Sequence, residues 1–237
     1  MKIIWQSIKL MMASVLLVVC FLTFKGYTEY RNALESKPLD VAVEEIVDNP
    51  SFVSISEVPE IYKRALLAVE DKRFYKHLGI DILAIGRAAI NDLKAMAFVE
   101  GGSTITQQLA KNMFFSQDKN ICRKIAEAFM ALTIEKKYSK DQILDLYINK
   151  IYYGDGYYTL RDASEGYFGK HPKDLTEDEC TLLVGIPNAP SVYSPTNSME
   201  MARQRQQQVI RILEKANGKQ ENMFIVTTGE HMMIQRK

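Results

Sequence analysis

The segment "AVEDKRFYKHLGID", residues 68–81, carries an acidic side chain at the end of an apolar helical face. Glu70 follows Leu66, Leu67 and Val69, so its carboxylate is expected to lose part of its contact with water. Desolvation disfavours the charged form of a carboxylate, which suits a general acid or base. The basic residues that follow would oppose this effect, and a charged, solvated helix end is the competing interpretation.

A second segment, "EGGSTITQQLAKNMFF", joins a glycine pair to a helix with a polar face. Ser103 or Thr104 is expected to cap this helix. On a helical wheel, Thr104, Gln108, Lys111 and Asn112 share one sector beside an apolar sector. Neutral donors and one cation near a helix start can hold phosphate or sugar hydroxyl groups. A solvated helix face is the alternative, although such faces usually carry Glu and Lys rather than Gln and Asn.

A third segment, "RKIAEAFMALTIEKKYSK", contains a charged pair at helical spacing. Arg123 and Glu127 are four residues apart on one face, with Lys124 beside them. An exposed pair of this kind contributes about 0.2–0.5 kcal/mol. The neighbours of Glu127 are mostly alanine and phenylalanine, however, which predicts a partly buried carboxylate held by arginine.

The N-terminal run "LMMASVLLVVCFLTF", residues 10–24, is almost wholly apolar. It is slightly shorter than the roughly 17–25 residues that a spanning helix needs. Residues 3–8 lengthen it, and Lys9 can reach toward the headgroups. Because no small-residue cleavage site follows, residues 1–25 are expected to form a cytoplasmic tip and an uncleaved transmembrane signal-anchor. A cleaved secretory signal is the alternative.

The rest of the chain is expected to be one mostly α-helical domain. We assign residues 26–50 to a spacer, 51–217 to the domain and 218–237 to a tail of unknown role. Apolar residues at helical spacing predict one helix from residue 56 to a stop at Gly79. Further helices are expected near residues 82–97, 103–115, 121–138, 140–151, 160–168, 176–186 and 199–216. Only the C-terminal "MFIVTT" has a strand-like character.

Composition excludes several classes of protein. Charged residues make up 25% and hydrophobic residues 47% of the 237 residues, as in a globular protein with a core. The net charge of +1 argues against nucleic-acid binding through bulk charge. The three cysteines and three histidines lack metal-ligand spacing, so a zinc site is not expected.

Five motifs follow one another without long insertions, namely "EDKRFYKHLGID", "GGSTITQQLAKN", "RKIAEAFMALTIEKKYSK", "ILDLYINKIYYGDGYYTLRDASEGYFGK" and "LTEDECTLLVGIPNAPSVYSP". Together they resemble the motifs of glycosyltransferase family 51, the peptidoglycan glycosyltransferases, whose domain also occurs in class A penicillin-binding proteins. The resemblance covers roughly residues 50–215. It implies a mostly α, lysozyme-like head with a smaller membrane-proximal jaw lobe, after one N-terminal transmembrane helix. No transpeptidase motifs follow, so the monofunctional form is expected.

The resemblance also implies roles for individual residues. Glu70 matches the general base that takes the proton from the 4-hydroxyl of lipid II. That hydroxyl attacks the lipid-pyrophosphate-linked growing chain with inversion and releases undecaprenyl pyrophosphate. Glu127 matches a donor-side carboxylate that could act through a divalent cation, Mg²⁺ or Mn²⁺; no covalent cofactor is expected. The residues implied in substrate binding are Ser103, Thr104, Gln107, Gln108, Lys111, Asn112, Lys119, Arg123 and Lys124, with Asp71, Phe74 and His77 from the first motif.

The expected partners are lipid II, the lipid-linked glycan chain, the membrane, and other cell-wall synthesis or division proteins. The expected location is the bacterial cytoplasmic membrane, crossed once, with the catalytic domain on the extracytoplasmic face. Two competing functions are a lysozyme-like muramidase or lytic transglycosylase, and a non-catalytic cell-wall scaffold. The basic residues favour polymerisation, because a hydrolase has no pyrophosphate to hold.

Overall fold

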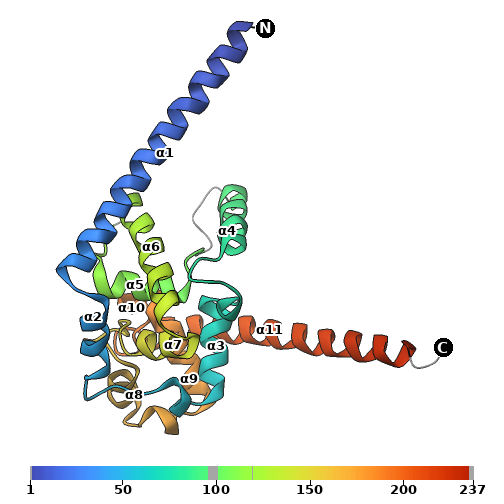
Figure 1. Ribbon diagram of the computed structural model, residues 1–237. Coiled ribbons are helices and arrows are strands. Elements are labelled where there is room, and N and C mark those ends of the chain that lie inside the picture. The colour runs from blue at the N-terminus through green and yellow to red at the C-terminus, as the bar shows by residue number, and fades with distance from the viewer. Residues whose placement is uncertain (1, 96–100, 119, 235–237) are drawn as a thin grey trace. The chain divides into compact units, whose positions relative to one another are not determined.

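The computed structural model describes residues 2–95, 101–118 and 120–234 of the chain, and these are mostly helical (Figure 1). They contain no strand, which confirms the mostly α fold, and "MFIVTT" belongs to a helix. Four short 3₁₀ helices, η1 (Ile55–Glu57), η2 (Phe74–Lys76), η3 (Pro172–Asp174) and η4 (Ile186–Asn188), lie among the α-helices. The α-helices are α1 (Lys2–Ser36), α2 (Leu39–Val47), α3 (Glu60–Glu70), α4 (Ile82–Ala95), α5 (Ile105–Phe114), α6 (Ile121–Lys137), α7 (Lys140–Ile148), α8 (Leu160–Phe168), α9 (Glu177–Gly185), α10 (Pro190–Tyr193) and α11 (Met199–Ile234).

The chain divides into two compact units, and each is built from two separate segments. Unit 1 comprises Met1–Asn49 and Tyr75–Tyr147. Unit 2 comprises Pro50–Phe74 and Ile148–Lys237. The segment predicted as one domain, residues 51–217, therefore contributes to both units.

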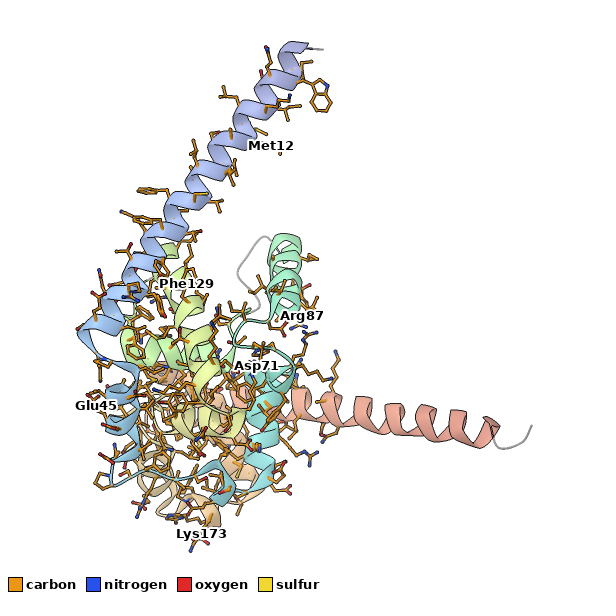
Figure 2. The ribbon with its side chains drawn as sticks, viewed as in Figure 1. Met12, Glu45, Asp71, Arg87, Phe129 and Lys173 are labelled. Carbon is orange, nitrogen blue, oxygen red and sulfur yellow. The ribbon has the colours of Figure 1, made fainter. Side chains whose placement is uncertain are left out.

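Helix α1 is long and apolar enough to cross a membrane. Its 35 residues extend about 52 Å at 1.5 Å per residue, whereas the hydrocarbon layer is about 30 Å thick. The candidate span, Ile4–Ser36, lies near the N-terminus, and no residue of its most apolar stretch is buried. Met12, labelled in Figure 2, is one of its exposed apolar residues. The C-terminal part of α1 is left to contact the rest of unit 1.

Within the segment predicted to be a spacer, residues 26–49 are mostly helical and belong to unit 1. Helix α1 continues through the first of them to Ser36, and α2 buries Leu39, Ala42 and Ile46. An ion pair between Lys137 and Asp40 joins the end of α6 to the start of α2. The sequence did not predict α2, which has only nine residues, three of them acidic.

Helices α5 and α6 pack against each other in unit 1, and a buried cap fixes the start of α5. Thr104 accepts a hydrogen bond from the Gln107 backbone N–H, and the Gln107 side chain accepts one from the Thr104 N–H, both at 3.1 Å. Thr104 Oγ1 also donates to the Gly79 carbonyl at 2.6 Å. Gly79 has φ +90, and a Cβ there would lie 3.0 Å from the Ala131 backbone, so this turn requires glycine.

In unit 2, helix α3 packs on α9 and α11 and ends at Glu70. The buried hydroxyls of Tyr62 and Tyr153 are 2.8 Å apart and hydrogen-bonded. Asn149 accepts a hydrogen bond from the Val53 N–H at 3.0 Å and donates one to the Val53 carbonyl at 2.7 Å. These contacts hold the N-terminal segment of unit 2 on its C-terminal segment, and so fix the helix that carries Glu70.

Candidate active site

A buried carboxylate on α6 lies between two cations. Glu127 has 0% of its side chain exposed, so it is buried more completely than the partial burial predicted from its neighbours. Its Oε1 is 3.0 Å from Arg123 Nε, and its Oε2 is 2.8 Å from Lys124 Nζ. The predicted pairing of Arg123 with Glu127 is therefore confirmed, and Lys124 takes part in it as well.

The Arg123–Glu127 contact leaves hydrogen-bonding capacity unused. Arg123 Nε and Glu127 Oε1 are buried, and in the described part of the chain neither has a hydrogen-bond partner of good geometry, although they form an ion pair. Another nitrogen of the guanidinium, Nη1, donates to the Ser116 carbonyl at 2.8 Å. Buried polar atoms are normally hydrogen-bonded. Arg123 and Glu127 are therefore held together by their charges rather than by a well-aligned hydrogen bond.

Two further polar residues join this cluster from other elements. Lys124 Nζ donates to Ser103 Oγ at 2.6 Å, which brings the loop before α5 onto α6. Lys111 on α5 is half-buried, and burial lowers the pKa of its ammonium group below the usual value. The nearby Glu127 carboxylate opposes this shift of the pKa, whereas Arg123 and Lys124 add to it. The result is a site with three cations and one carboxylate, which can bind an anion.

The cluster adjoins an apolar cavity of about 820 Å³ in unit 1. Ser103, Gln107 and Lys124 are its polar wall. The remaining lining is glycine and apolar side chains: Ile80, Ile85, Ala88, Ala89, Gly101, Gly102, Ile121, Ile125, Ala128, Phe129 and Leu132. A molecule with a charged head and a hydrocarbon chain would find complementary surfaces for both parts here.

The residues around Glu127 do not fit a resident divalent cation. Both carboxylate oxygens lie against cationic nitrogens, at 3.0 and 2.8 Å. No group of three or more His, Cys, Asp or Glu side chains able to hold a metal occurs among the described residues. Mg²⁺ and Mn²⁺ prefer carboxylate, carbonyl and water oxygens. The chain itself supplies one carboxylate and three positive charges at this position.

The residues of the first motif are divided between the two units. Glu70 is the last residue of α3 in unit 2 and is partly exposed. Burial is the main reason that the pKa of Tyr62 is raised, and the charge of Glu70 adds to this shift. Asp71, labelled in Figure 2, caps α3 and is 7% exposed, and Phe74 is 1% exposed. His77 belongs to unit 1, is 8% exposed, and accepts a hydrogen bond from the Gly79 N–H at 3.1 Å through Nδ1. The burial of the last three residues favours a supporting role.

The remaining predicted site residues lie on or beside α5. Thr104 and Gln107 use their polar atoms in the helix cap, although Gln107 also borders the cavity. Gln108 accepts a hydrogen bond from the buried Tyr147 hydroxyl at 3.2 Å. Asn112 accepts one from the Gln117 side chain at 3.4 Å. Lys119 lies outside the described residues.

Sequence reasoning missed the apolar cavity wall on α6. Ile125, Phe129 and Leu132 recur at intervals of three and four residues, which is the spacing of one helix face. The same spacing is typical of a core face, so the sequence carried no signal that these side chains line a cavity. The contact between Ser103 and Lys124 also went unpredicted, because it joins residues 21 positions apart on different elements.

Comparison with known proteins agrees with the motifs. A family model described as Transglycosylase matches residues 40–214. The chain is 46% identical over 166 residues to penicillin-binding protein 1F of Bacillus subtilis (strain 168), covering 70% of this chain and 23% of the relative. It is 47% identical over 165 residues to penicillin-binding protein 1A of Aquifex aeolicus (strain VF5), covering 69% and 23%.

A third relative is penicillin-binding protein 1B of Vibrio cholerae serotype O1, 42% identical over 184 residues, with 76% of this chain and 24% of the relative covered. The chain thus spans about a quarter of the length of these curated relatives. The match to the family model nevertheless includes every residue of the α5–α6 cluster and Glu70. On this evidence, the chain belongs to the transglycosylase family.

Proposed function

We propose that this protein is a peptidoglycan glycosyltransferase that polymerises lipid II into glycan strands during bacterial cell-wall synthesis. The family membership supports this class of activity. The observation that carries the proposal is the sharing of Lys124 and Ser103 between the cationic cluster and the apolar cavity. A lipid-linked pyrophosphate has this combination of a doubly anionic head and a hydrocarbon chain.

In the proposed reaction, the acceptor is lipid II and the donor is the growing, lipid-linked chain. Glu70 takes the proton from the acceptor 4-hydroxyl, and the freed electron pair attacks the anomeric carbon of the donor. The bond from that carbon to the pyrophosphate oxygen breaks, and undecaprenyl pyrophosphate leaves with the bonding electrons. Attack from the opposite face converts the α-linked donor into a β-1,4 linkage.

The cluster on α5 and α6 is proposed to stabilise the leaving group. Negative charge grows on the pyrophosphate as the bond breaks, so Lys111, Arg123 and Lys124 would bind the transition state more strongly than the ground state. Glu127 holds the last two of these cations at 3.0 and 2.8 Å, which fixes their positions before the substrate arrives. This preorganisation gives Glu127 a role that does not require it to exchange a proton.

We place the protein in the bacterial cytoplasmic membrane, with α1 as a single span and the rest of the chain on the extracytoplasmic face, where lipid II is consumed. Helix α1 supports the membrane assignment by its length and apolar composition. Other cell-wall synthesis and division proteins are further proposed partners, on the strength of the pathway alone.

The competing functions make different use of the site. A muramidase or lytic transglycosylase cuts a glycan that carries no lipid pyrophosphate, so neither the cavity nor the three cations would have a substrate group to bind. A non-catalytic scaffold would not need a carboxylate with unused hydrogen-bonding capacity beside them. Both are therefore less well supported than polymerisation.

The direct test is polymerisation of labelled lipid II by the full chain in phospholipid vesicles. We expect a ladder of glycan chains and release of undecaprenyl pyrophosphate. Glu70→Gln should reduce the rate by about 10²–10⁴-fold, the usual contribution of a general base. Glu60→Gln is a matched control, because Glu60 is an exposed glutamate in the first turn of the same helix. An assay with a chelator tests whether a cation bound to the pyrophosphate is needed.

The same samples separate the alternatives. Cleavage of finished peptidoglycan without any polymer would identify a hydrolase. If neither reaction occurs while the protein is folded and inserted, the scaffold reading replaces the enzyme. Near-normal polymerisation by Glu70→Gln would show that another group is the base.

A further inference from the structure

The C-terminal part of α1, residues 25–36, packs along α6 within unit 1 (Figure 1). Phe129 of α6 lies beside this part of α1 in Figure 2. Its ring contacts Tyr27 edge-on at a centroid distance of 5.3 Å and Tyr30 at 5.8 Å. The Tyr30 hydroxyl is hydrogen-bonded to Thr133 Oγ1 at 2.9 Å. The helix that could span the membrane thus continues as a rod held against α6.

The two helices approach each other closely at Gly26, which is buried. A Cβ at this position would lie 2.6 Å from Ile125 Cβ and 2.9 Å from the Cys122 carbonyl oxygen. Real Cβ atoms essentially never approach other atoms within 3.0 Å. Glycine inside a helix costs roughly 0.5–1 kcal/mol relative to alanine. At residue 26 glycine allows α1 and α6 to approach to a distance at which any side chain would overlap Ile125 or the Cys122 carbonyl.

The part of α6 that Gly26 contacts is the part that carries the anion site. Cys122 and Ile125 immediately flank Arg123 and Lys124, and Glu127 follows within the next turn. Ile125 contacts α1 and also lines the apolar cavity. A displacement of α1 from α6 would therefore move the cavity wall and the cationic cluster together.

We propose that Gly26 is a positioning residue, through which the membrane-anchoring helix sets the location of α6 and hence of Lys124 and Glu127 in the substrate site. The proposal rests on the proposed function, because it concerns the same lipid-pyrophosphate site. It makes α1 a structural part of that site as well as an anchor. A displacement of α1 would then be transmitted to the substrate site through the contact at Gly26.

The size of the expected displacement follows from the contact distances. Ordinary contacts begin at 3.4 Å, so a Cβ at 2.6 Å from Ile125 Cβ requires a separation of about 0.8 Å, the difference between the two values. A misplacement of about 1 Å far from the chemistry can cost about 10²-fold in rate. A larger, branched side chain at residue 26 should separate the helices further.

The test compares variants of the full chain in phospholipid vesicles, with insertion checked by flotation and folding by circular dichroism. Gly26→Ala should lower kcat/KM for lipid II by about tenfold and Gly26→Val by about 10²-fold. Asn32→Val is the matched control, because it puts the same side chain at an exposed position on α1. The variant with both Gly26→Ala and Ile125→Gly lacks the contact with Ile125 Cβ at 2.6 Å and should recover part of the activity lost by Gly26→Ala, measured against Ile125→Gly alone. The recovery is partial because the Cys122 carbonyl oxygen remains 2.9 Å away.

Binding of farnesyl pyrophosphate gives a second readout that does not depend on polymerisation. We expect Gly26→Val to weaken this binding about tenfold or more, and Asn32→Val to leave it unchanged. The proposal is overturned if both valine variants bind and polymerise alike, or if Ile125→Gly brings no recovery. If the wild type binds the probe but makes no polymer, the proposed function fails, and the binding comparison still decides the role of Gly26.

Discussion

The replacement of Glu127 by glutamine removes one charge from the site and little else. The amide has nearly the same volume as the carboxylate, so the cavity and the packing of α6 should be preserved. What is lost is the anionic partner of Arg123 Nε at 3.0 Å and of Lys124 Nζ at 2.8 Å. Three neighbouring cations then lie together without a compensating charge.

The structure sets the expected magnitudes. Breaking a fully buried ion pair costs about 3–5 kcal/mol. The Lys124 side chain is 44% exposed, so solvent screens its part of the interaction, and the glutamine oxygen can still accept a hydrogen bond. We therefore expect Glu127→Gln to lower the free energy of unfolding by about 2–3 kcal/mol. The loss of preorganised cations should lower kcat by about 10²–10³-fold, or about 2.7–4 kcal/mol in the barrier.

The assay combines urea denaturation of the detergent-solubilised protein with polymerisation of labelled lipid II. Glu135→Gln is the matched control, because Glu135 is a second buried glutamate on α6, with its side chain 4% exposed. It accepts hydrogen bonds from Thr106 Oγ1 at 2.6 Å and Lys140 Nζ at 2.7 Å. We expect this control to lose comparable stability, and its folded molecules to retain activity within about threefold of the wild type.

Two results would refute the reasoning. Near-normal kcat in Glu127→Gln would show that the carboxylate is not needed to hold the cations. An equal loss of activity in the two variants would show that Glu127 acts through the stability of α6 alone.

Three further predictions concern single groups. Burial lowers the pKa of Lys111, so the folded protein releases this proton at a lower pH than the unfolded chain. The affinity for farnesyl pyrophosphate should therefore fall as the pH rises through the lowered pKa. Lys111→Arg should abolish this fall. Between the two pKa values the unfolded chain binds more protons, so the contribution of Lys111 to stability should rise with pH, as urea titrations at several pH values can check. Asn149→Leu removes both hydrogen bonds to Val53 and should cost about 2–4 kcal/mol in urea denaturation, and a cost under 1 kcal/mol would contradict the account of this contact. Thr104→Val removes the helix cap and the donor to Gly79, and should cost about 1–3 kcal/mol in the same assay, with Thr104→Ser largely restoring stability.

The local features of the site could be predicted because they depend on short spacings. The cap at Thr104 follows from a Thr-x-x-Gln pattern, and the pairing of Arg123 with Glu127 follows from four-residue spacing. The burial of Glu127 was visible in its alanine neighbours. Each of these depends on residues within one turn or two.

Contacts between elements could not be predicted in the same way. The hydrogen bond from Lys124 to Ser103 and the close approach of Gly26 to Ile125 both depend on how helices pack, which no local pattern specifies. Gly26 follows the apolar run closely, and a glycine at such a position gives no sign in the sequence of a close contact between helices. Helix α2, within the segment interpreted as a spacer, went unpredicted for the same reason, since it is stabilised by packing of Leu39 and Ile46 rather than by its own helix propensity.

The discontinuity of unit 2 has a consequence for how the chain folds as it emerges from the ribosome. Val53 is synthesised 96 residues before Asn149, its hydrogen-bonding partner, so the first segment of unit 2 must wait with its apolar faces unpaired. Such a delay exposes the nascent chain to aggregation and proteases. The whole second segment of unit 1 is synthesised during this interval, so unit 1 can fold before the long-range pairing within unit 2 forms.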